Sequence, residues 1–272
     1  MKLNVIGGGP AGLYYAILHK KSFPQADVTV YERNRPDDTF GFGIVLSDET
    51  LANLREADEP TYGDIAASFA YWDDIYVHYK GATLRSSGHG FSGLKRLTLL
   101  EILQRRATQL GIDIRYQTGI ASVEPYLDAD LVVAADGINS VIRENWTDHF
   151  RPSIDWRPNK FVWLGVKATL PGFTYSFREN ADGIWNLHAY MFTQGECTLI
   201  VETTGEAFER SGIGVQDERA TVAYTRKLFP EEIGDGEIQT NRSYWRNFPA
   251  VRCERWSHEN VVLLGDAAHS AH

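Results

Sequence analysis

Residues 3–33, LNVIGGGPAGLYYAILHKKSFPQADVTVYER, contain the strongest structural signal in the sequence. A short apolar strand runs into the glycine turn Gly7–Gly12, and apolar residues then recur at the spacing of a helix from Pro10 to about Lys21. The apolar run Val28–Tyr31 predicts a second strand, parallel to the first, that ends at Glu32. This order of strand, turn, helix and strand predicts the start of an α/β domain.

Each glycine of the turn has a physical reason. Gly7 permits a tight turn, Gly9 lets backbone N–H groups approach a pyrophosphate, and Gly12 lets the helix pack close to the strand. The helix N-terminus favours an anion, and Glu32, 20 positions after Gly12, is placed to accept hydrogen bonds from an adenosine ribose. The pattern predicts a dinucleotide site rather than a purely structural turn, and it leaves open which dinucleotide binds.

Composition narrows the class of protein. The chain has 272 residues, of which 43% are hydrophobic, and its net charge of −9 argues against a general nucleic-acid surface. The two cysteines, Cys197 and Cys253, match neither a disulfide framework nor metal-ligand spacing, so we expect no metal and a reducing compartment. The sequence has neither a signal peptide nor an apolar run of about 18 residues, so we expect a soluble, cytoplasmic protein that binds no membrane.

Three further segments of the first half suit a cofactor. Gly41-Phe42-Gly43 predicts a backbone that either approaches a flat cofactor ring or forms a buried loop. A helix predicted over Leu94–Leu110 begins near Arg96, which either reaches a phosphate near the first turn or lies on a solvated helix face. Asp136-Gly137 follows the buried strand Leu131–Ala134 and is either a simple turn or a ligand site, because open α/β sheets bind ligands at the carboxyl ends of their strands.

The texture of the sequence changes from about Arg151 to Trp256. Strands with aromatic faces predominate there, which predicts a mostly antiparallel layer inserted into the first domain. Within the predicted strand Gly183–Met191, the polar side chains of Asn186, His188 and Tyr190 alternate onto one face. That face is either the wall of a pocket or a solvated surface.

The last predicted strand, Asn260–Leu264, returns to the first domain and runs into Gly265-Asp266, with a helix expected from Ala267. With this motif in place, the chain resembles the flavoprotein aromatic hydroxylases of the para-hydroxybenzoate hydroxylase type. The resemblance rests on three motifs that occur in order along the chain. They are Gly7–Gly12 with Glu32 and Arg33, then Asp136-Gly137 with Asn139, Ser140 and Arg143, and finally Gly265-Asp266.

The resemblance implies an FAD-dependent enzyme. It assigns FAD contacts to residues of the three motifs and to one arginine outside them, namely Gly7, Gly9, Pro10, Ala11, Gly12, Glu32, Arg33, Arg96, Asp136, Gly265 and Asp266. It also implies hydride transfer from NAD(P)H to FAD, capture of O2 as a flavin hydroperoxide, and hydroxylation of an aromatic ring. No single catalytic side chain stands out, and His188 and Tyr190 are the candidates if a base deprotonates the substrate.

A closer likeness is to the branch of this family that acts on aryl-CoA thioesters, such as salicyloyl-CoA 5-hydroxylase and 2-aminobenzoyl-CoA monooxygenase. The stretches that carry it are Thr39–Leu54, Gly88–Leu103 and Tyr244–Trp256, while Trp185–Glu202 is similar to violacein-pathway hydroxylases. The resemblance therefore implies a small aromatic substrate, CoA-linked in this branch, with O2 and NAD(P)H as co-substrates. A flavin-dependent reductase on the same scaffold is an alternative function. The sequence leaves the oligomeric state open, and a homodimer is one of the assemblies that it allows.

The expected fold is α/β, with a Rossmann-like FAD-binding domain and an inserted, mostly antiparallel β substrate domain. The FAD-binding domain is expected over residues 1–70, 92–150 and 257–272, and the substrate domain over residues 71–91 and 151–256. Members of the family continue beyond the Gly-Asp motif with further helices. We therefore expect this chain to lack the C-terminal part of its FAD-binding domain, and an inactive fragment that binds FAD weakly or not at all is a further alternative.

Overall fold

The computed structural model describes residues 1–270, and it divides the chain into two compact units. The first unit comprises residues 1–38, 99–157 and 249–272, of which 271 and 272 lie outside the described residues. The second unit comprises residues 39–98 and 158–248. The chain therefore leaves the first unit and returns to it twice, as expected of one domain inserted into another.

The first unit is built on a six-stranded sheet in the order β16, β17, β9, β1, β2, β8. β1 (Lys2–Ile6) runs parallel to β2 (Asp27–Tyr31) on one side and to β9 (Leu131–Ala134) on the other. The carboxyl ends of β1 and β9 thus form a topological switch point, which is where open α/β sheets bind ligands. The remaining strands are β8 (Asp113–Arg115), β16 (Ser257–His258) and β17 (Val261–Leu263).

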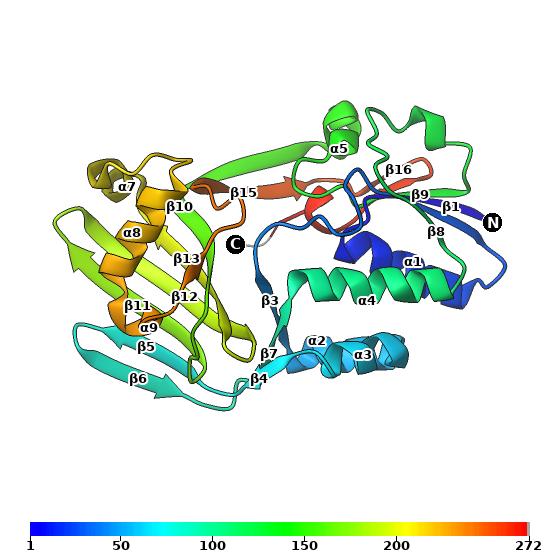
Figure 1. Ribbon diagram of the computed structural model, residues 1–272. Coiled ribbons are helices and arrows are strands. Elements are labelled where there is room, and N and C mark those ends of the chain that lie inside the picture. The colour runs from blue at the N-terminus through cyan, green and yellow to red at the C-terminus, as the bar shows by residue number, and fades with distance from the viewer. Residues whose placement is uncertain (271–272) are drawn as a thin grey trace. The chain divides into compact units, whose positions relative to one another are not determined.

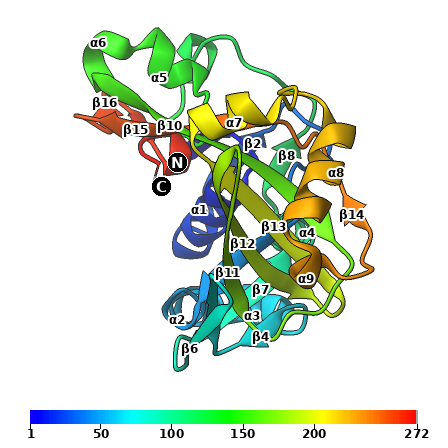
Figure 2. The same ribbon diagram turned by 90° about the vertical axis from the view of Figure 1, so that its left-hand side faces the viewer.

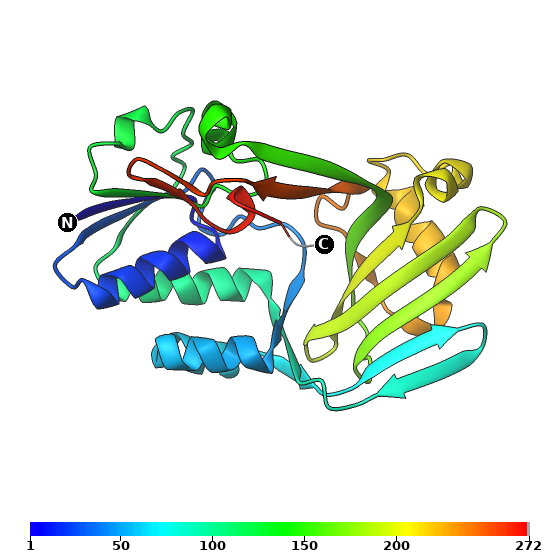
Figure 3. The same cartoon turned by 180° about the vertical axis from the view of Figure 1, so that it is seen from behind.

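Helices lie on both faces of this sheet (Figures 1 and 3). One face carries α1 (Pro10–Ser22) and α4 (Arg96–Gln109), and the other carries α5 (Val141–Asn145) and α6 (Thr147–Phe150). Two short 3-10 helices, η1 (Glu124–Tyr126) and η2 (Gly265–Ala267), complete the unit. The helix predicted from Pro10 is confirmed, and so is the parallel strand after it.

The second unit contains an eight-stranded sheet in the order β14, β10, β13, β12, β11, β5, β6, with β15 paired to β10. β11 and β5 are parallel, whereas β11, β12, β13 and β10 form an antiparallel series. The strands are β5 (Ile75–Tyr79), β6 (Ala82–Ser86), β10 (Pro152–Val166), β11 (Phe173–Asn180), β12 (Gly183–Thr193), β13 (Glu196–Thr203), β14 (Ile238–Gln239) and β15 (Arg246–Cys253). The expected α/β class with an inserted, mostly antiparallel layer is confirmed.

One face of the larger sheet is covered by α7 (Gly205–Ser211), α8 (Glu218–Leu228) and α9 (Pro230–Ile233) (Figure 2). Trp185 and Leu187 of β12 are fully buried there against Phe208 and Phe229. This apolar layer is the core of the second unit. Because side chains alternate along a strand, Asn186 and its neighbours at every second position face away from it.

The smaller sheet of the second unit has the order β3, β7, β4, and two helices lie between β3 and β4 in the chain. Its elements are β3 (Gly43–Ser47), α2 (Asp48–Ala57), α3 (Glu59–Ala66), β4 (Ala70–Trp72) and β7 (Phe91–Lys95). Residues 39–70 and 92–98, which we expected in the FAD-binding domain, thus pack with the second unit. The physical reason is close contact, since a Cβ on Gly43 would meet Phe192 at 2.3 Å and one on Gly93 would meet the Met191 carbonyl at 1.9 Å.

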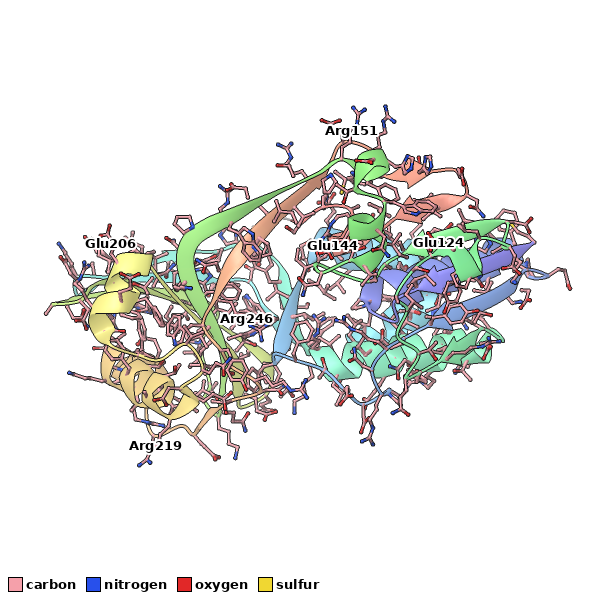
Figure 4. The ribbon with its side chains drawn as sticks, turned by 90° about the horizontal axis from the view of Figure 1, so that it is seen from above. Glu124, Glu144, Arg151, Glu206, Arg219 and Arg246 are labelled. Atoms are coloured by element: carbon pink, nitrogen blue, oxygen red, sulfur yellow. The ribbon has the colours of Figure 1, made fainter. Side chains whose placement is uncertain are left out.

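Several charged side chains of the first unit lie at its surface. Glu124, Glu144 and Arg151 project from the first unit (Figure 4), and their exposure fits charged groups that keep their hydration.

Both cysteines are free. Among the residues described, no group of His, Cys, Asp and Glu is arranged to hold a metal ion, and no helix is long and apolar enough to cross a membrane.

Candidate functional site

Most of the glycine turn is required by packing within the protein. Gly7 has φ +109°, and a Cβ there would lie 2.2 Å from the Ala135 carbonyl oxygen. A Cβ on Gly12 would lie 2.1 Å from the Gly7 carbonyl oxygen, and one on Gly8 would lie 2.9 Å from Cβ of Glu32. At Gly9 nothing lies within 4 Å of an added Cβ. The backbone of Gly9 is therefore open on the side where a side chain would stand.

Gly9 is also the N-cap residue of α1, and no side chain caps that helix. The first N–H groups of an α-helix have no partner within the helix, and together they carry the positive end of its dipole. Pro10, at the first helical position, has no N–H to offer. The backbone N–H groups of Ala11 and Gly12 belong to this first turn, and the space beside Gly9 is open. The start of α1 is therefore a suitable place for a phosphate.

Glu32 lies beside the turn, as expected from its spacing. Its Oε2 accepts a hydrogen bond from Gly8 N–H at 2.7 Å, and its Oε1 accepts from both the backbone and the side-chain amide of Asn34 at 2.7 Å. The carboxylate therefore holds the glycine turn and the segment after β2 in one geometry. Arg33, next to it, is exposed. Whether either residue contacts a ribose stays a prediction.

Asp136 stands at the carboxyl end of β9, where it performs a task that the sequence did not indicate. Its Oδ2 accepts hydrogen bonds from the N–H groups of Val141 at 2.8 Å and Ile142 at 3.4 Å, so it caps α5. Its Oδ1 is buried and has no hydrogen-bond partner within residues 1–270. Oδ2 of Asp136 thus accepts hydrogen bonds from the N-terminus of α5, and Oδ1 is left as an acceptor for a hydrogen-bond donor of a ligand.

The third motif lies against the first. Gly265 has φ +62°, and a Cβ there would lie 3.1 Å from Cβ of Ala11 at the start of α1. Asp266 is exposed, on η2. The helix that we expected from Ala267 is represented in the described residues by this single 3-10 turn, Gly265–Ala267. The first and third motifs are therefore neighbours in space as well as in the pattern.

Arg143 joins the second motif to the third, and sequence reasoning assigned it no role. Its guanidinium donates to the carbonyl oxygens of Ile138 at 2.6 Å, Ala267 at 3.2 Å and Asp266 at 3.4 Å. Only 1% of the residue is exposed. The signal that could have revealed it is an arginine one turn after the helix cap Ser140, on a short helix that packs under the sheet.

Arg96 belongs to the second unit. It is the first residue of α4, its N–H donates to the Phe42 carbonyl at 2.9 Å, and its guanidinium lies 4.5 Å from the centre of the Phe40 ring. A cation over an aromatic face is a stabilising contact. Its expected contact with FAD stays a prediction.

The glycines around Phe42 approach aromatic rings of the protein itself. A Cβ on Gly41 would lie 3.0 Å from the ring of Trp163, and one on Gly43 would meet Phe192. Gly43 is buried at the start of β3. Of the two alternatives that the sequence left open for this segment, these contacts fit the buried one.

The two candidate bases also lie in the second unit, on β12. The Tyr190 hydroxyl donates to the Gly43 carbonyl at 2.9 Å, and burial raises its pKa to about 12. A phenol that stays protonated and already donates to the backbone is poorly suited to accept a proton. His188 is half-buried, and its Nε2 lies 2.7 Å from Nδ2 of Asn186.

The residues of the first unit fit an FAD pyrophosphate. The fit to the pyrophosphate rests on the open backbone at Gly9 and the uncapped N-terminus of α1, while the partnerless Oδ1 of Asp136, a hydrogen-bond acceptor, suits a hydroxyl group of the same cofactor. All three belong to the motifs at the switch point between β1 and β9. Backbone N–H groups would hold the phosphates there without any basic side chain.

Comparison with known sequences gives the family. Residues 1–272 match the family described as FAD binding domain. Salicyloyl-CoA 5-hydroxylase of Streptomyces sp is 39% identical over 281 residues, covering 100% of this chain but only 54% of that protein, so the chain spans about half of its length. 3-Hydroxy-4-methyl-anthranilyl-[aryl-carrier protein] 5-monooxygenase of Streptosporangium sibiricum is 32% identical, covering 100% of this chain and 73% of that protein. Protodeoxyviolaceinate monooxygenase of Chromobacterium violaceum is 31% identical, with coverage of 100% and 74%.

Solved structures share the fold. 2-Methyl-3-hydroxypyridine-5-carboxylic acid oxygenase superposes with a TM-score of 0.81 at 20% identity, covering 98% of this chain and 75% of that one. p-Nitrophenol 4-monooxygenase of Pseudomonas putida superposes with a TM-score of 0.77 at 15% identity, covering 99% and 73%. With the family match over its whole length and a relative above 30% identity, this chain belongs to the FAD binding domain family.

Proposed function

We propose that the chain forms the FAD-binding and substrate-binding parts of an NAD(P)H-dependent monooxygenase that hydroxylates an aromatic substrate. The observation that carries the proposal is Gly9, the one glycine of Gly7–Gly12 that no neighbour among the described residues requires. A glycine kept open at an uncapped helix N-terminus suits the close approach of a pyrophosphate. The names of the three relatives described above, one hydroxylase and two monooxygenases, support the reaction type.

The proposed roles of the residues follow the motifs. Backbone N–H groups of the glycine turn bind the pyrophosphate, Glu32 accepts from the adenosine ribose, and Asp266 contacts the ribityl chain. Asp136 takes part through its partnerless Oδ1. Arg33 and Arg96 are assigned by the family resemblance alone. When bound, FAD supplies the oxygen activation, so the protein needs to hold the aromatic ring, exclude water and direct protons.

The proposed substrate is an aromatic acyl thioester. Two relatives are named for aromatic acyl groups on a carrier, one on CoA and one on an aryl-carrier protein. In the second unit, the sheet face away from α7, α8 and α9 carries Tyr175, Phe177 and Trp163 beside the polar Asn186 and His188. Aromatic side chains with a few polar groups are typical of small-molecule binding surfaces, so we assign the aromatic ring to this face.

Two finer parts of the proposal concern the setting of the protein. The free Cys197 and Cys253 support the expected cytoplasmic compartment, because disulfides are rare there. A homodimer is the assembly that we propose for the purified protein. Light scattering at several protein concentrations measures the mass directly, and a monomer mass throughout would contradict a dimer.

The first experiment is to purify the chain and to titrate it with FAD while recording the visible spectrum. A protein-bound flavin spectrum supports the cofactor assignment. The loaded protein is then given NADH or NADPH, O2 labelled with oxygen-18, and salicyloyl-CoA. A product that gains one labelled oxygen supports a monooxygenase. NAD(P)H oxidation that needs no O2 and leaves the label out of the product would favour the reductase, and a chain that takes up no FAD would overturn the proposal for this chain.

A further inference from the structure

The second unit contains a cavity of about 650 Å³ that is lined by residues of α2, α3 and β4. The two helices lie side by side at this place (Figures 1 and 3). Small-molecule sites typically have volumes of about 300–1,000 Å³, so the space is large enough for a ligand. None of the described residues that we assign to FAD or to the aromatic ring lines it. The cavity is therefore a candidate site of its own.

One wall of the cavity is a single face of α2. Asp48, Ala52 and Arg55 follow one another at spacings of four and three residues, which brings their side chains onto one side of a helix. Leu51 is buried at the same wall, whereas Ala52 and Arg55 are exposed. Because Ala52 carries only a methyl group, this wall leaves room beside the helix.

Three aromatic residues form the rest of the lining that concerns a ligand. Tyr62 lies on α3, Phe69 precedes β4, and Tyr71 lies on β4 with 53% of its surface exposed. Such rings offer apolar surface, and the tyrosine hydroxyls add groups that both donate and accept hydrogen bonds. A lining of this kind suits a ligand that combines alkyl groups with amides.

The charges of the lining restrict the ligand further. Arg55 lies over the ring of Tyr62, 6.0 Å from its centre, and makes no ion pair within residues 1–270. Asp48 and Glu56 add two carboxylates, so the three groups together carry a net charge of −1. One phosphate has a partner in Arg55, and amide N–H groups have partners in the carboxylates. A ligand with several phosphates would be repelled by those carboxylates.

The cavity lies across one strand from the sheet face that we assign to the aromatic ring. Tyr71 and Trp72 are consecutive in β4, so their side chains lie on opposite faces of it. Trp72 stacks on Tyr190 of β12, with ring centres 6.1 Å apart and planes at 24°. In the described part of the chain β4 is the outer strand of the smaller sheet. An elongated ligand therefore connects the two faces by passing around this edge.

We propose that the cavity binds the 4′-phosphopantetheine arm of the aromatic acyl thioester, with the phosphate of the arm at Arg55. The assignment rests on the proposed function. The arm is the part that CoA thioesters and carrier-protein thioesters have in common, and two relatives are named for one carrier each. It is a flexible chain with two amide groups and one phosphate at its end. These groups match the rings, the carboxylates and the single arginine of the lining.

The phosphate contact is tested by calorimetry on the chain without flavin, with pantetheine and 4′-phosphopantetheine as the ligands. We expect both to bind to the wild type. Arg55→Gln should raise the dissociation constant of 4′-phosphopantetheine about 10-fold, the effect of losing a charge-assisted hydrogen bond, and should leave that of pantetheine unchanged. Arg219→Gln is the matched control, because Arg219 is an exposed arginine on α8 that does not line the cavity (Figure 4).

The position of the arm is tested by filling the cavity. In Ala52→Trp the indole occupies the space beside α2, so the dissociation constants of both ligands should rise at least about 10-fold. Asn53→Trp places the same side chain at the next residue, which is exposed and does not line the cavity, and should leave both constants unchanged. Equal effects of the two tryptophans would place the arm elsewhere and overturn the proposal.

Adenosine 3′,5′-bisphosphate tests the other end of CoA, because it has the nucleotide phosphates without the arm. It should not displace 4′-phosphopantetheine. A wild-type chain that binds this nucleotide at the cavity, or that binds neither pantetheine compound, would overturn the assignment of the arm.

Kinetics of the FAD-loaded chain separate this proposal from the proposed function. Ala52→Trp should raise KM for salicyloyl-CoA about 10-fold with little change in kcat, because the arm contributes binding rather than chemistry. An unchanged KM in a chain that hydroxylates salicyloyl-CoA would overturn the cavity assignment and leave the proposed function in place. Binding of 4′-phosphopantetheine that depends on Arg55 and Ala52, without any hydroxylated product, would support the cavity and overturn the proposed function.

Discussion

The guanidinium of Arg143 donates a hydrogen bond to the carbonyl oxygen of Ala267 at 3.2 Å, which ties the short helix α5 to the turn that carries Asp266. A second donation, to the Ile138 carbonyl at 2.6 Å, ties the same side chain to the loop after Asp136. The residue is 1% exposed. Two of the three motifs are thus held together by one buried cation.

Arg143→Met should therefore destabilise the protein. The substitution keeps much of the volume but leaves buried carbonyl groups without their charged donor, and we expect a loss of about 2–4 kcal/mol in the free energy of unfolding. Urea denaturation followed by circular dichroism measures it. Arg151→Met is the control, because Arg151 makes an exposed ion pair with Glu254 that should contribute less than about 1 kcal/mol (Figure 4). Equal losses in the two variants would contradict a special role for Arg143.

Gly9→Ala should separate FAD binding from folding. An added methyl meets nothing within 4 Å, so we expect the free energy of unfolding to change by less than about 1 kcal/mol. The methyl does occupy the space proposed for the pyrophosphate, and the FAD dissociation constant should rise roughly 10- to 100-fold, as expected from the loss of a charge-assisted hydrogen bond. Fluorescence titration of FAD and urea denaturation measure the two effects.

Gly12→Ala provides the matched control for that substitution. Its Cβ would lie 2.1 Å from the Gly7 carbonyl oxygen, so α1 would have to move away from β1. We expect a loss of about 3 kcal/mol in the free energy of unfolding. If Gly9→Ala bound FAD as tightly as the wild type, the pyrophosphate would not lie at this turn.

Local signals in the sequence predicted the elements well where one segment determines its own structure. Acidic residues such as Asp48 and Glu49 are typical of the first turn of a helix, and the structure has a helix over Asp48–Ala57 that Ser47 caps. Lys80-Gly81 reads in the sequence as a hairpin-type turn, and in the structure it joins β5 to β6, with φ of +47° and +78° at the two turn residues. Both depend on neighbours in sequence rather than on distant packing.

Long-range pairing produced the differences. The sequence of Phe161–Lys167 by itself predicts a short strand, whereas the structure has the 15-residue β10, which pairs with β15 from the far end of the chain. Leu94 and Lys95, expected in a helix, pair with β3 instead. The same kind of contact places residues 39–70 with the second unit. The spacing of apolar residues within a short stretch of sequence does not indicate which distant segments that stretch pairs with.

The candidate site also has a part that local sequence predicts and a part that depends on distant segments. The glycine turn with Glu32 was predictable because its chemistry lies within one strand-turn-helix unit. The capping role of Asp136 and the links made by Arg143 were not, because each requires segments that are far apart in sequence. Tyr190 shared a polar face with His188 in the pattern, and only the contact with Gly43 distinguishes a structural phenol from a candidate base.

Glu32→Gln should weaken FAD binding more than it weakens the fold. The carboxylate accepts hydrogen bonds with both oxygens, from Gly8 and Asn34, and an amide can match only one of these because its nitrogen donates. The glycine turn is then less well fixed, and we expect the FAD dissociation constant to rise about 10-fold. Glu144→Gln, an exposed substitution on α5, should leave it unchanged. Unaltered FAD affinity in Glu32→Gln would contradict the assignment of Glu32 to the cofactor.

Tyr190→Phe should reveal a structural phenol through the pH dependence of stability. Burial raises the pKa of Tyr190 from 10.0 to about 12, so its neutral form stabilises the folded chain fully below about pH 10, and this contribution is lost as the pH rises toward 12. Phenylalanine lacks the hydrogen bond to Gly43 and should reduce the free energy of unfolding by about 1 kcal/mol near neutral pH. Only the wild type has a group at this position that ionises at alkaline pH, and the complete effect lowers its free energy of unfolding by about 2–3 kcal/mol. The free energies of unfolding of the two proteins should therefore become equal near about pH 11.

Urea denaturation of both proteins at about pH 8, 10 and 11 measures this crossing. The comparison between the two is needed because Cys197, whose pKa burial also raises to about 12, contributes equally to both. Substrate turnover in Tyr190→Phe should keep its pH profile, because a phenol that stays protonated does not act as the base in the neutral range. A constant stability difference at every pH would show that burial does not raise the pKa of Tyr190, and a displaced pH profile of turnover would restore Tyr190 as a candidate base.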